Sequence, residues 1–362
     1  MKILLVRLRQ IGDVVFTTPT LAALADHFPG AQLTYLVEPA AAPVVSGNPH
    51  LARVIVAPRR SGFGGTLDDL RLGRELRHMR FDVAIDFHGG PRASLLTWLS
   101  RAPRRVGYEI KGRAWMYTDR VARARELRPR HSVENQWDLL TALGVPLPSR
   151  ERYPADMPVD AQVAAAVRDR LTAHGVSSHD EVVVMHVSAG NPFRRWPLES
   201  FATVAAALAN AAPAVRVIIT SGPSEAGAAQ QVIDAARARL PQQAQGAVLA
   251  CGEFSLSELR ALTDIAALYI GGDSGPMHVA STSRVPMVSL YGPTLPARSE
   301  PWRASDEAAA VDVHGLSCRP CEQRVCVHGD FRCLSGITPE QVIDAATRLL
   351  ARNRLRLGAI QP

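Results

Sequence analysis

The chain has 362 residues, of which 47% are apolar, 6% aromatic and 21% charged, and its formal net charge is +7. This length exceeds one ordinary domain and suits two α/β domains, and the apolar fraction excludes a disordered chain. The positive charge favours an anionic partner such as a nucleotide, a phosphorylated glycolipid or a membrane surface. No block of Lys and Arg resembles a nucleic-acid arm, so we expect no nucleic-acid partner.

The N-terminal segment enters a short apolar run that is interrupted by Arg7 and Arg9. It lacks the long apolar region of a signal peptide, and no later stretch has about 18 uninterrupted apolar residues. We therefore expect a cytoplasmic protein.

Four of the five cysteines cluster as Cys318-x2-Cys321-x4-Cys326-x6-Cys333. In a reducing compartment such a cluster does not predict a disulfide framework. Cysteine thiolates are ligands for structural zinc, but the last spacing is longer than the usual two to four residues. Two interpretations stay open: a structural zinc site, or a cysteine-rich loop without metal.

Strand-like and helix-like segments alternate through the first half of the chain. We predict strands over 3–8, 32–37, 53–57, 81–87 and 104–108, and helices over 14–28, 68–80 and 93–100. Continuous runs of Val, Ile and Leu with helices between them indicate a parallel sheet covered on both faces.

Prolines at 146, 148, 154 and 158 indicate a linker, after which the alternation restarts. A helix to about residue 173 is followed by predicted strands over 182–186, 215–220, 247–250, 267–270 and 287–291, and by a terminal helix over 339–350. We expect a domain over 1–155, a second over 156–337, and a helix and tail over 338–362 that pack back on the first. The predicted architecture is two doubly wound domains facing across a cleft, with ligands at the carboxyl ends of the strands.

The stretch 269–293 combines a strand end, a glycine-rich turn and a helix start. Asp273, Ser274 and Gly275 follow two glycines, and His278 lies one turn later. Backbone amides and the Ser274 hydroxyl at a helix N-terminus suit an anion, and the glycines allow a ligand to approach the backbone. The alternative is a strand-to-helix turn in which the Asp or Ser only caps the helix.

A second candidate site follows the first strand, where Asp13 comes after Gly12. A carboxylate there can accept a proton from an attacking hydroxyl, while Arg7 or Arg9 holds an acidic acceptor. The alternative is that Asp13 only caps the following helix.

Two further strand ends carry charged groups. Gly190 lies in a turn that can approach phosphates, and Arg194 or Arg195 can neutralise a leaving diphosphate. After the next strand, Glu225 can accept hydrogen bonds from a ribose, or cap a helix. We expect Trp196 to serve packing rather than chemistry.

Together these motifs resemble the ADP-heptose:lipopolysaccharide heptosyltransferase family, glycosyltransferase family 9. The matching motifs are Arg7-x4-Gly12-Asp13, Arg194-Arg195-Trp196-Pro197 and Gly272-Asp273-Ser274-Gly275-Pro276-Met277-His278. With the Cys318 region and Ile337-Thr338-Pro339-Glu340 the resemblance covers nearly the whole chain. Each motif is weakly specific, whereas their order and spacing together are specific.

The resemblance implies a GT-B fold and an inverting, metal-independent glycosyltransferase that needs no cofactor. The donor would be a nucleotide-diphosphate sugar, with ADP-heptose expected, bound by the C-terminal domain. The acceptor would be a lipopolysaccharide core or a similar anionic glycan, bound by the N-terminal domain. Such an enzyme is expected in the cytoplasm, with peripheral contact at the inner membrane.

The resemblance also assigns roles. Asp13 occupies the place of the general base. The resemblance gives donor-binding roles to Arg194, Glu225, Asp273, Ser274, Gly275 and His278. From their places after predicted strands, we add Ser188, Gly190 and Arg195 as donor-binding positions, and Arg7, Arg9, Gly12 and Arg92 as acceptor-binding positions. Arg194 stands where the family usually has Lys, and a planar guanidinium contacts phosphate differently from a point charge. Cysteine-rich ends occur among family members, so the cysteines here do not single out zinc.

Other classes remain as alternatives. A non-catalytic nucleotide-sugar binding protein would use the same pocket, and a GT-B enzyme such as a UDP-sugar epimerase would share the fold. A zinc-dependent nucleic-acid module at the cysteines lacks a basic, aromatic surface. Arg71, Arg74, Arg77 and Arg80 recur at helical spacing, and can face an anionic membrane or simply water.

Overall fold

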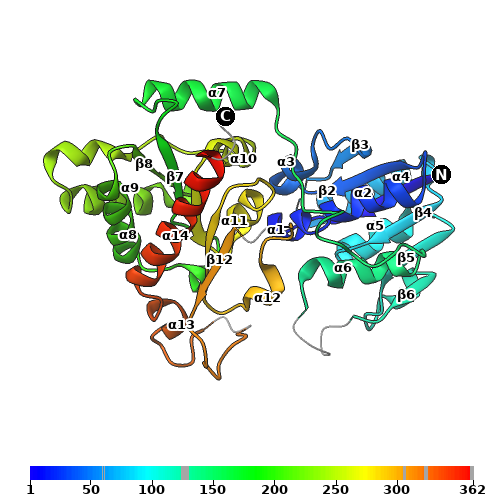
Figure 1. Ribbon diagram of the computed structural model, residues 1–362. Coiled ribbons are helices and arrows are strands. Elements are labelled where there is room, and N and C mark those ends of the chain that lie inside the picture. The colour runs from blue at the N-terminus through cyan, green and yellow to red at the C-terminus, as the bar shows by residue number, and fades with distance from the viewer. Residues whose placement is uncertain (59, 61, 124–129, 305–306, 322–324, 359–362) are drawn as a thin grey trace. The chain divides into compact units, whose positions relative to one another are not determined.

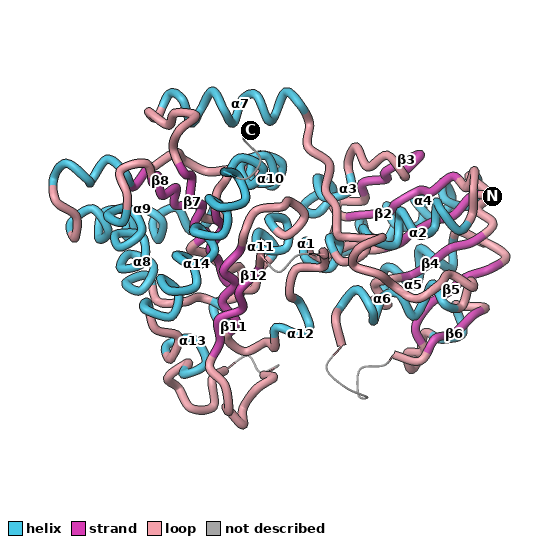
Figure 2. Tube along the Cα trace, viewed as in Figure 1, coloured by secondary structure: helices cyan, strands magenta, loops and turns pink. Residues whose placement is uncertain are grey.

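The structure is a computed structural model that describes the chain except residues 59, 61, 124–129, 305–306, 322–324 and 359–362. It divides into two compact units, Met1–Pro158 with Trp302–Ala304, and Val159–Pro301 with Ser305–Pro362. Each unit contains one parallel six-stranded sheet and surrounding helices (Figures 1 and 2). The chain therefore has two Rossmann-like α/β units, which is the composition of a GT-B fold.

The first unit has the strand order β3-β2-β1-β4-β5-β6. Its strands are β1 (Lys2–Val6), β2 (Gln32–Val37), β3 (Leu51–Val56), β4 (Val83–Asp86), β5 (Arg104–Tyr108) and β6 (Asp119–Val121). Its helices are α1 (Ile11–Val15), α2 (Thr18–His27), α3 (Ala42–Val45), α4 (Gly62–His78), α5 (Pro91–Leu99) and α6 (Ser132–Thr141). The order reverses between β1 and β4, so the loops after these two strands flank the place where such sheets bind ligands.

One predicted helix of the first unit is two helices in the structure. The helix expected over 14–28 is broken between α1 and α2, where the Thr17 hydroxyl donates to the Val14 carbonyl at 2.6 Å. Pro19 lies in the first turn of α2. Proline has no N–H for a helical hydrogen bond, so it is tolerated at a helix start and not inside a continuous helix.

The second unit has the strand order β12-β11-β10-β7-β8-β9. Its strands are β7 (Glu181–His186), β8 (Val215–Thr220), β9 (Val248–Leu249), β10 (Leu268–Gly272), β11 (Met287–Tyr291) and β12 (Ala308–Asp312). Its helices are α7 (Ala161–Ala173), α8 (Leu198–Ala211), α9 (Ala226–Ala238), α10 (Leu256–Ile265), α11 (Gly275–Ala280), α12 (Pro296–Ser299), α13 (Arg332–Ser335) and α14 (Pro339–Gly358). Here the order reverses between β7 and β10.

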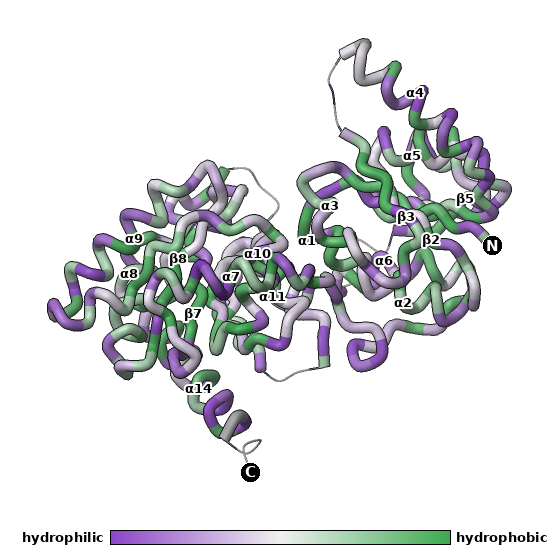
Figure 3. Tube along the Cα trace, turned by 90° about the horizontal axis from the view of Figure 1, so that it is seen from above, coloured by the Kyte–Doolittle hydropathy of each residue, from purple (hydrophilic) through white to green (hydrophobic). Residues whose placement is uncertain are grey.

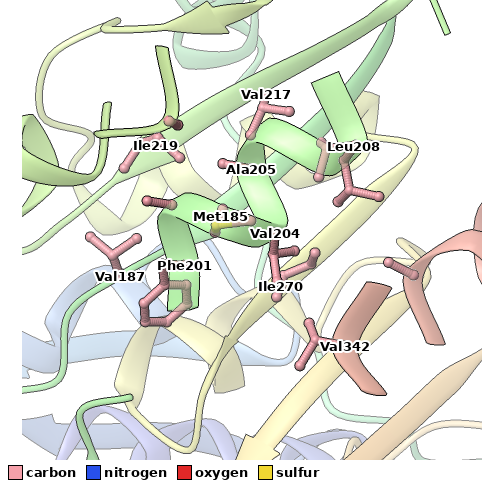
Figure 4. Packing of buried hydrophobic residues seen from close by; sticks show 14 of the residues in the cluster. Met185, Val187, Phe201, Val204, Ala205, Leu208, Val217, Ile219, Ile270 and Val342 are labelled. Carbon is pink, nitrogen blue, oxygen red and sulfur yellow. The ribbon is translucent and has the colours of Figure 1, made fainter. Parts of the chain in front are cut away.

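The core of the second unit explains why its strands and helices associate. Met185, Val217 and Ile270 project from three neighbouring strands, and Phe201 from α8 packs against the same cluster (Figure 4). Figure 3 shows the strands of both units as predominantly hydrophobic. Uninterrupted apolar strands of this kind are buried on both faces by helices.

The terminal helix differs from expectation. We expected residues 338–362 to pack back on the N-terminal domain, but α14 packs against α8 and against β10, β11 and β12 of its own unit. Its buried side chains recur at spacings of three and four residues: Val342, Ala345, Ala346, Leu349 and Leu350. This spacing forms one apolar stripe, which completes the core of the second unit.

Trp196 is part of this packing, as the sequence indicated. Its side chain is 2% exposed, contacts the Phe201 ring edge-on and donates from Nε1 to the Ile337 carbonyl at 3.0 Å. A Trp196→Ala variant leaves a large cavity and an unpaired carbonyl, so we expect a loss of about 3–5 kcal/mol in unfolding free energy. Urea unfolding measures it, and a loss below about 1 kcal/mol would contradict this packing role.

Among the residues that the structure describes, none of the helices is both long and apolar enough to cross a bilayer.

Candidate functional site

The first candidate site lies at the carboxyl end of β1. Arg7 follows that strand, is buried, and donates from Nη1 to the Phe87 carbonyl at 2.5 Å. Its Nη2 lies 2.5 Å from Oδ2 of Asp13, whose side chain is 39% exposed. Phe87 follows β4, so Arg7 connects the loops after the two strands at the reversal of strand order.

Asp13 caps the helix, as one of the two interpretations of the sequence held, and this contact involves only one of its carboxylate oxygens. It lies at the third position of α1, and its Oδ2 accepts the Gln10 N–H at 3.3 Å in a capping box. Arg7 contacts the same oxygen. Oδ1 of Asp13 accepts no hydrogen bond from the described residues. The carboxylate is therefore held in place through Oδ2, while Oδ1 stays available to a ligand.

Asp86 is a residue of this site that the sequence analysis missed. It ends β4, is fully buried, and accepts hydrogen bonds from the N–H groups of His88 at 2.9 Å and Gly89 at 2.8 Å. The Tyr117 hydroxyl donates to it at 2.6 Å. Burial raises the pKa of Asp86, although these donors and Arg7 act in the opposite direction. Asp86 therefore fixes the loop after β4 against which Arg7 rests.

Arg92 lies in a structural ion cluster. Its guanidinium pairs with Glu38 and Asp69, each at 2.9 Å, and donates to the carbonyls of Ala57 and Pro58. These contacts occupy all three nitrogens of the guanidinium, so an acceptor would have to compete with them for Arg92. Arg9 is exposed, whereas Gly12 is buried within α1.

The second candidate site is centred on Asp273, directly after β10. Its carboxylate is 3% exposed and lies 3.2 Å from Nη1 of Arg194 and 3.2 Å from Nε2 of His278. The Ser299 hydroxyl donates to Oδ1 of Asp273 at 3.1 Å, and the Thr294 hydroxyl donates to Oδ2. Burial alone would raise the pKa of Asp273, but His278, Arg194 and Thr294 together hold it well below its usual range.

Arg194 is positioned by contacts of a single nitrogen. It ends the 3-10 turn Pro192–Arg194, and its Nη1 contacts both the carboxylate and the carbonyl of Asp273. Nε and Nη2 have no hydrogen-bond partner within the described residues, and the side chain is 33% exposed. A β-carbon at Gly272 would lie 3.0 Å from the Arg194 carbonyl, so a larger residue there would press on the Arg194 backbone.

Ser274 precedes Gly275 at the start of α11, and its hydroxyl is buried. Among the described residues this hydroxyl has no hydrogen-bond partner. An unsatisfied buried hydroxyl costs about 1–3 kcal/mol, so such groups in native proteins commonly meet a ligand or water.

The remaining residues that the sequence analysis assigned to the donor lie beyond the ends of β7 and β8. Arg195 pairs with Glu225 at 2.5 Å and donates from Nε to the Ala189 carbonyl at 2.9 Å. Ser188 is buried, whereas Gly190 is exposed with open space around it. Because β10, β7 and β8 are neighbours in the sheet, their ends bring Asp273, Arg194, Ser188 and Glu225 to one edge.

The cysteine-rich loop is held by an arginine that the sequence analysis did not identify. Arg319 pairs with Asp312 at 2.6 Å and donates to the carbonyls of Val313 at 2.7 Å and Thr294 at 2.6 Å. The cysteines 318, 321, 326 and 333 form no disulfide. Across the described residues, no three or more His, Cys, Asp or Glu side chains gather to hold a metal ion. Arg319 thus connects the loop to Thr294, a partner of Asp273.

Comparison with known proteins identifies close counterparts over the full chain. Lipopolysaccharide heptosyltransferase 3 of Escherichia coli K12 is 27% identical over 357 residues, covering 95% of this chain and 96% of the relative. A glycosyltransferase family 9 structure from Veillonella parvula has a TM-score of 0.84 at 26% identity and 97% coverage of both chains. The structure of E. coli ADP-heptose LPS heptosyltransferase II has a TM-score of 0.78 at 21% identity, covering 98% and 100%.

The family model described as glycosyltransferase family 9 (heptosyltransferase) matches residues 70–331, well over half of the chain. The match includes the Arg194, Glu225 and Asp273 segments of the second unit. This chain belongs to glycosyltransferase family 9 and is a glycosyltransferase.

Proposed function

We propose that this enzyme transfers a heptose from ADP-heptose to a lipopolysaccharide core with inversion at the anomeric carbon. The observation that carries the proposal is that each unit of a family 9 chain presents a polar site at its strand ends. The site of the first unit has a carboxylate with a free oxygen, that of Asp13, and the site of the second unit has a cation with free N–H groups, that of Arg194. The relatives named as lipopolysaccharide heptosyltransferases support this choice of donor and acceptor.

Asp13 serves as the general base in this proposal. Arg7 and Gln10 hold Oδ2, which leaves Oδ1 to take the proton from the acceptor hydroxyl. The hydroxyl oxygen then bonds to the anomeric carbon on the face opposite the diphosphate, and the bond to the diphosphate oxygen breaks with its electron pair. Arg7 and the exposed Arg9 also give this end of the first unit a positive charge that suits an anionic acceptor.

Arg194 stabilises the departing ADP. Its free Nε and Nη2 groups can donate to diphosphate oxygens, while the carboxylate and carbonyl of Asp273 fix Nη1. Ser274 and the Gly275 amide supply further donors, and Glu225 accepts from the ribose hydroxyls. These fixed donors perform the charge neutralisation that a divalent ion performs elsewhere, so we propose that the reaction needs no metal.

A transfer assay tests this function. The enzyme is incubated with ADP-heptose and a core acceptor that lacks the last heptose, and mass spectrometry follows the acceptor. We expect the gain of one heptose and release of ADP. A UDP-sugar in place of ADP-heptose tests the epimerase alternative, and donor binding without transfer or release would favour the non-catalytic binding protein.

Peripheral membrane contact, with the enzyme at the cytoplasmic face of the inner membrane, is part of the proposal. Arg71, Arg74 and Arg77 are exposed along one side of α4, next to the partly exposed Leu67 and Leu70. Figure 3 shows hydrophilic segments recurring along this helix. Arginines with adjacent apolar side chains suit an anionic bilayer surface. Arg80 lies beyond the end of α4 in a left-handed conformation, with φ of 54°, so it does not extend this row.

Charge reversal on α4 tests this contact. Each arginine near an anionic surface contributes about 1 kcal/mol, so R71E/R74E/R77E should weaken binding to phosphatidylglycerol vesicles at least a hundredfold. R348E/R352E on α14 is the matched control, because these arginines are also exposed on a helix. Equal vesicle sedimentation of both variants would contradict a membrane contact through α4.

A further inference from the structure

His186 is a buried titratable residue that the mechanism above does not use. It ends β7 and is 4% exposed. Its Nδ1 lies 3.0 Å from the Thr220 hydroxyl and its Nε2 lies 3.0 Å from the Ser188 hydroxyl. The Gly222 N–H donates to the Ser188 hydroxyl at 2.8 Å. We call Thr220, His186, Ser188 and Gly222 the His186 network.

The hydroxyl partners of His186 suit an imidazole in its neutral form, which its burial favours. A neutral imidazole has one donor and one acceptor, and each hydroxyl can complement either role, so both bonds form in both tautomers. Burial lowers the pKa of His186 to about 4, which keeps the ring neutral at physiological pH. The network is therefore complete under the conditions in which the enzyme works.

The network ends on the turn that carries Glu225. Gly222 is the N-cap of the 3-10 turn Pro223–Glu225, and its carbonyl accepts the Glu225 N–H at 2.9 Å. A β-carbon at Gly222 would lie 3.5 Å from Oε2 of Glu225 and 3.7 Å from the Ser188 hydroxyl. Ser188, Gly222 and the Glu225 carboxylate thus surround one small volume, and Arg195 holds the other carboxylate oxygen at 2.5 Å.

We propose that His186 is a positioning residue for the nucleoside of the donor. It orients Ser188, which fixes the Gly222 amide and, through the Gly222 turn, the carboxylate of Glu225. This inference rests on the proposed function, because it takes Glu225 as the group that receives the ribose hydroxyls. Ser188, which the sequence analysis placed among the donor-binding residues, then acts mainly on the turn.

A purely structural role would be to join β7 to β8. Those strands already pair in register from Glu181 to His186, and the Val187 N–H continues the ladder to the Thr220 carbonyl at 3.0 Å. The side-chain bonds of His186 add a connection beyond this ladder, towards Gly222. Loss of the network should therefore change ligand affinity more than it changes strand pairing.

Two substitutions separate the nitrogens of His186. The Asn side chain in His186→Asn reaches only the Nδ1 position and keeps Thr220, whereas the Gln side chain in His186→Gln reaches the Nε2 position and keeps Ser188. Loss of one hydrogen bond corresponds to about five- to tenfold in affinity. We expect His186→Asn to weaken ADP binding by that factor in calorimetry, and to raise the donor KM while kcat changes less than about twofold. His186→Gln should have the ADP affinity and the donor KM of the wild type.

Ser188→Ala and the double variant His186→Asn/Ser188→Ala complete a double-mutant cycle. If the network acts as one unit, Ser188→Ala loses the same affinity, and the double variant loses no more than either single variant. Additive losses, or ADP affinity in His186→Asn equal to that of the wild type, would overturn the proposal. A lower melting temperature of His186→Asn with unchanged ADP affinity would also overturn it.

Exchange of the Gly222 amide separates this proposal from the function on which it rests. Without ligand, the amide should exchange faster in His186→Asn than in His186→Gln, because only the former frees Ser188. Equal exchange in the two variants overturns the network. A wild-type enzyme that fails to bind ADP contradicts the proposed donor, whatever the exchange rates.

Discussion

Asp13→Asn should lower kcat by about 10²–10⁴-fold while ADP affinity stays within about twofold of the wild type. The amide keeps the size of the side chain but cannot accept the proton of the attacking hydroxyl. Arg194, Asp273 and Glu225 lie in the second unit and are untouched by this change. Initial rates of ADP release give kcat, and calorimetry gives the affinity.

Asp344→Asn is a suitable control for that experiment, because Asp344 is an exposed aspartate on α14. Its rate should equal that of the wild type. If Asp13→Asn retained more than about a tenth of the wild-type rate, another group would have to accept the proton. A parallel loss of ADP affinity would point instead to a folding defect.

Asp273→Asn should both destabilise the enzyme and abolish donor binding. The substitution leaves the Arg194 guanidinium without its buried counter-charge, and removing one partner of a buried ion pair costs about 3–5 kcal/mol. Arg194 also loses the contact that positions it for the diphosphate. Urea unfolding reports the stability, and calorimetry with ADP reports the binding. An unchanged ADP affinity would remove Asp273 from the donor site.

The stability difference between Asp273→Asn and the wild type should depend on pH. The pKa of Asp273 is depressed in the folded state from its ordinary value of 3.8, so the folded state binds fewer protons there than the unfolded state. Its contribution is therefore complete well above pH 3.8 and is lost as the pH falls below that value. Unfolding at pH 7 and pH 3 should show a smaller difference at pH 3, and a larger one would contradict an ionised Asp273.

Much of the fold was predictable because its strands are continuous apolar runs between turn residues. β2, β5, β8 and β11 have the bounds that the sequence predicted. The short edge strands β6 and β12 were missed. β12 reads Ala-Ala-Ala-Val-Asp, and alanine has low strand propensity, so only pairing with β11 defines it.

The segment Trp302–Ala304 returns to the first unit, and the local sequence pattern around it did not predict this. Trp302 belongs to that unit, donates from Nε1 to the Tyr153 carbonyl at 2.9 Å and accepts the Ala155 N–H at 2.8 Å. Its ring lies 4.7 Å from that of His131. These partners are about 150 residues away, a separation at which periodicity carries no information.

The sequence located the charged residues of the candidate site but not the groups that position them. Glycine turns after strands indicated Asp13, Arg194 and Asp273. The contacts of Asp86 with Tyr117, and of Arg319 with Thr294, depend on which strands become neighbours. For Asp86 a signal was available in the sequence, because this aspartate ends a strand shortly before two glycines.

The central claim is a single displacement by the acceptor hydroxyl, with Asp13 as general base and fixed cations at the departing diphosphate, and the anomeric configuration of the product tests it most directly. The enzyme is given ADP-heptose of known configuration and a core acceptor in the presence of EDTA, and NMR of the product gives the configuration of the new linkage. The account predicts full turnover with the configuration opposite to that of the donor. Retention of configuration, or loss of turnover that added metal restores, would contradict it.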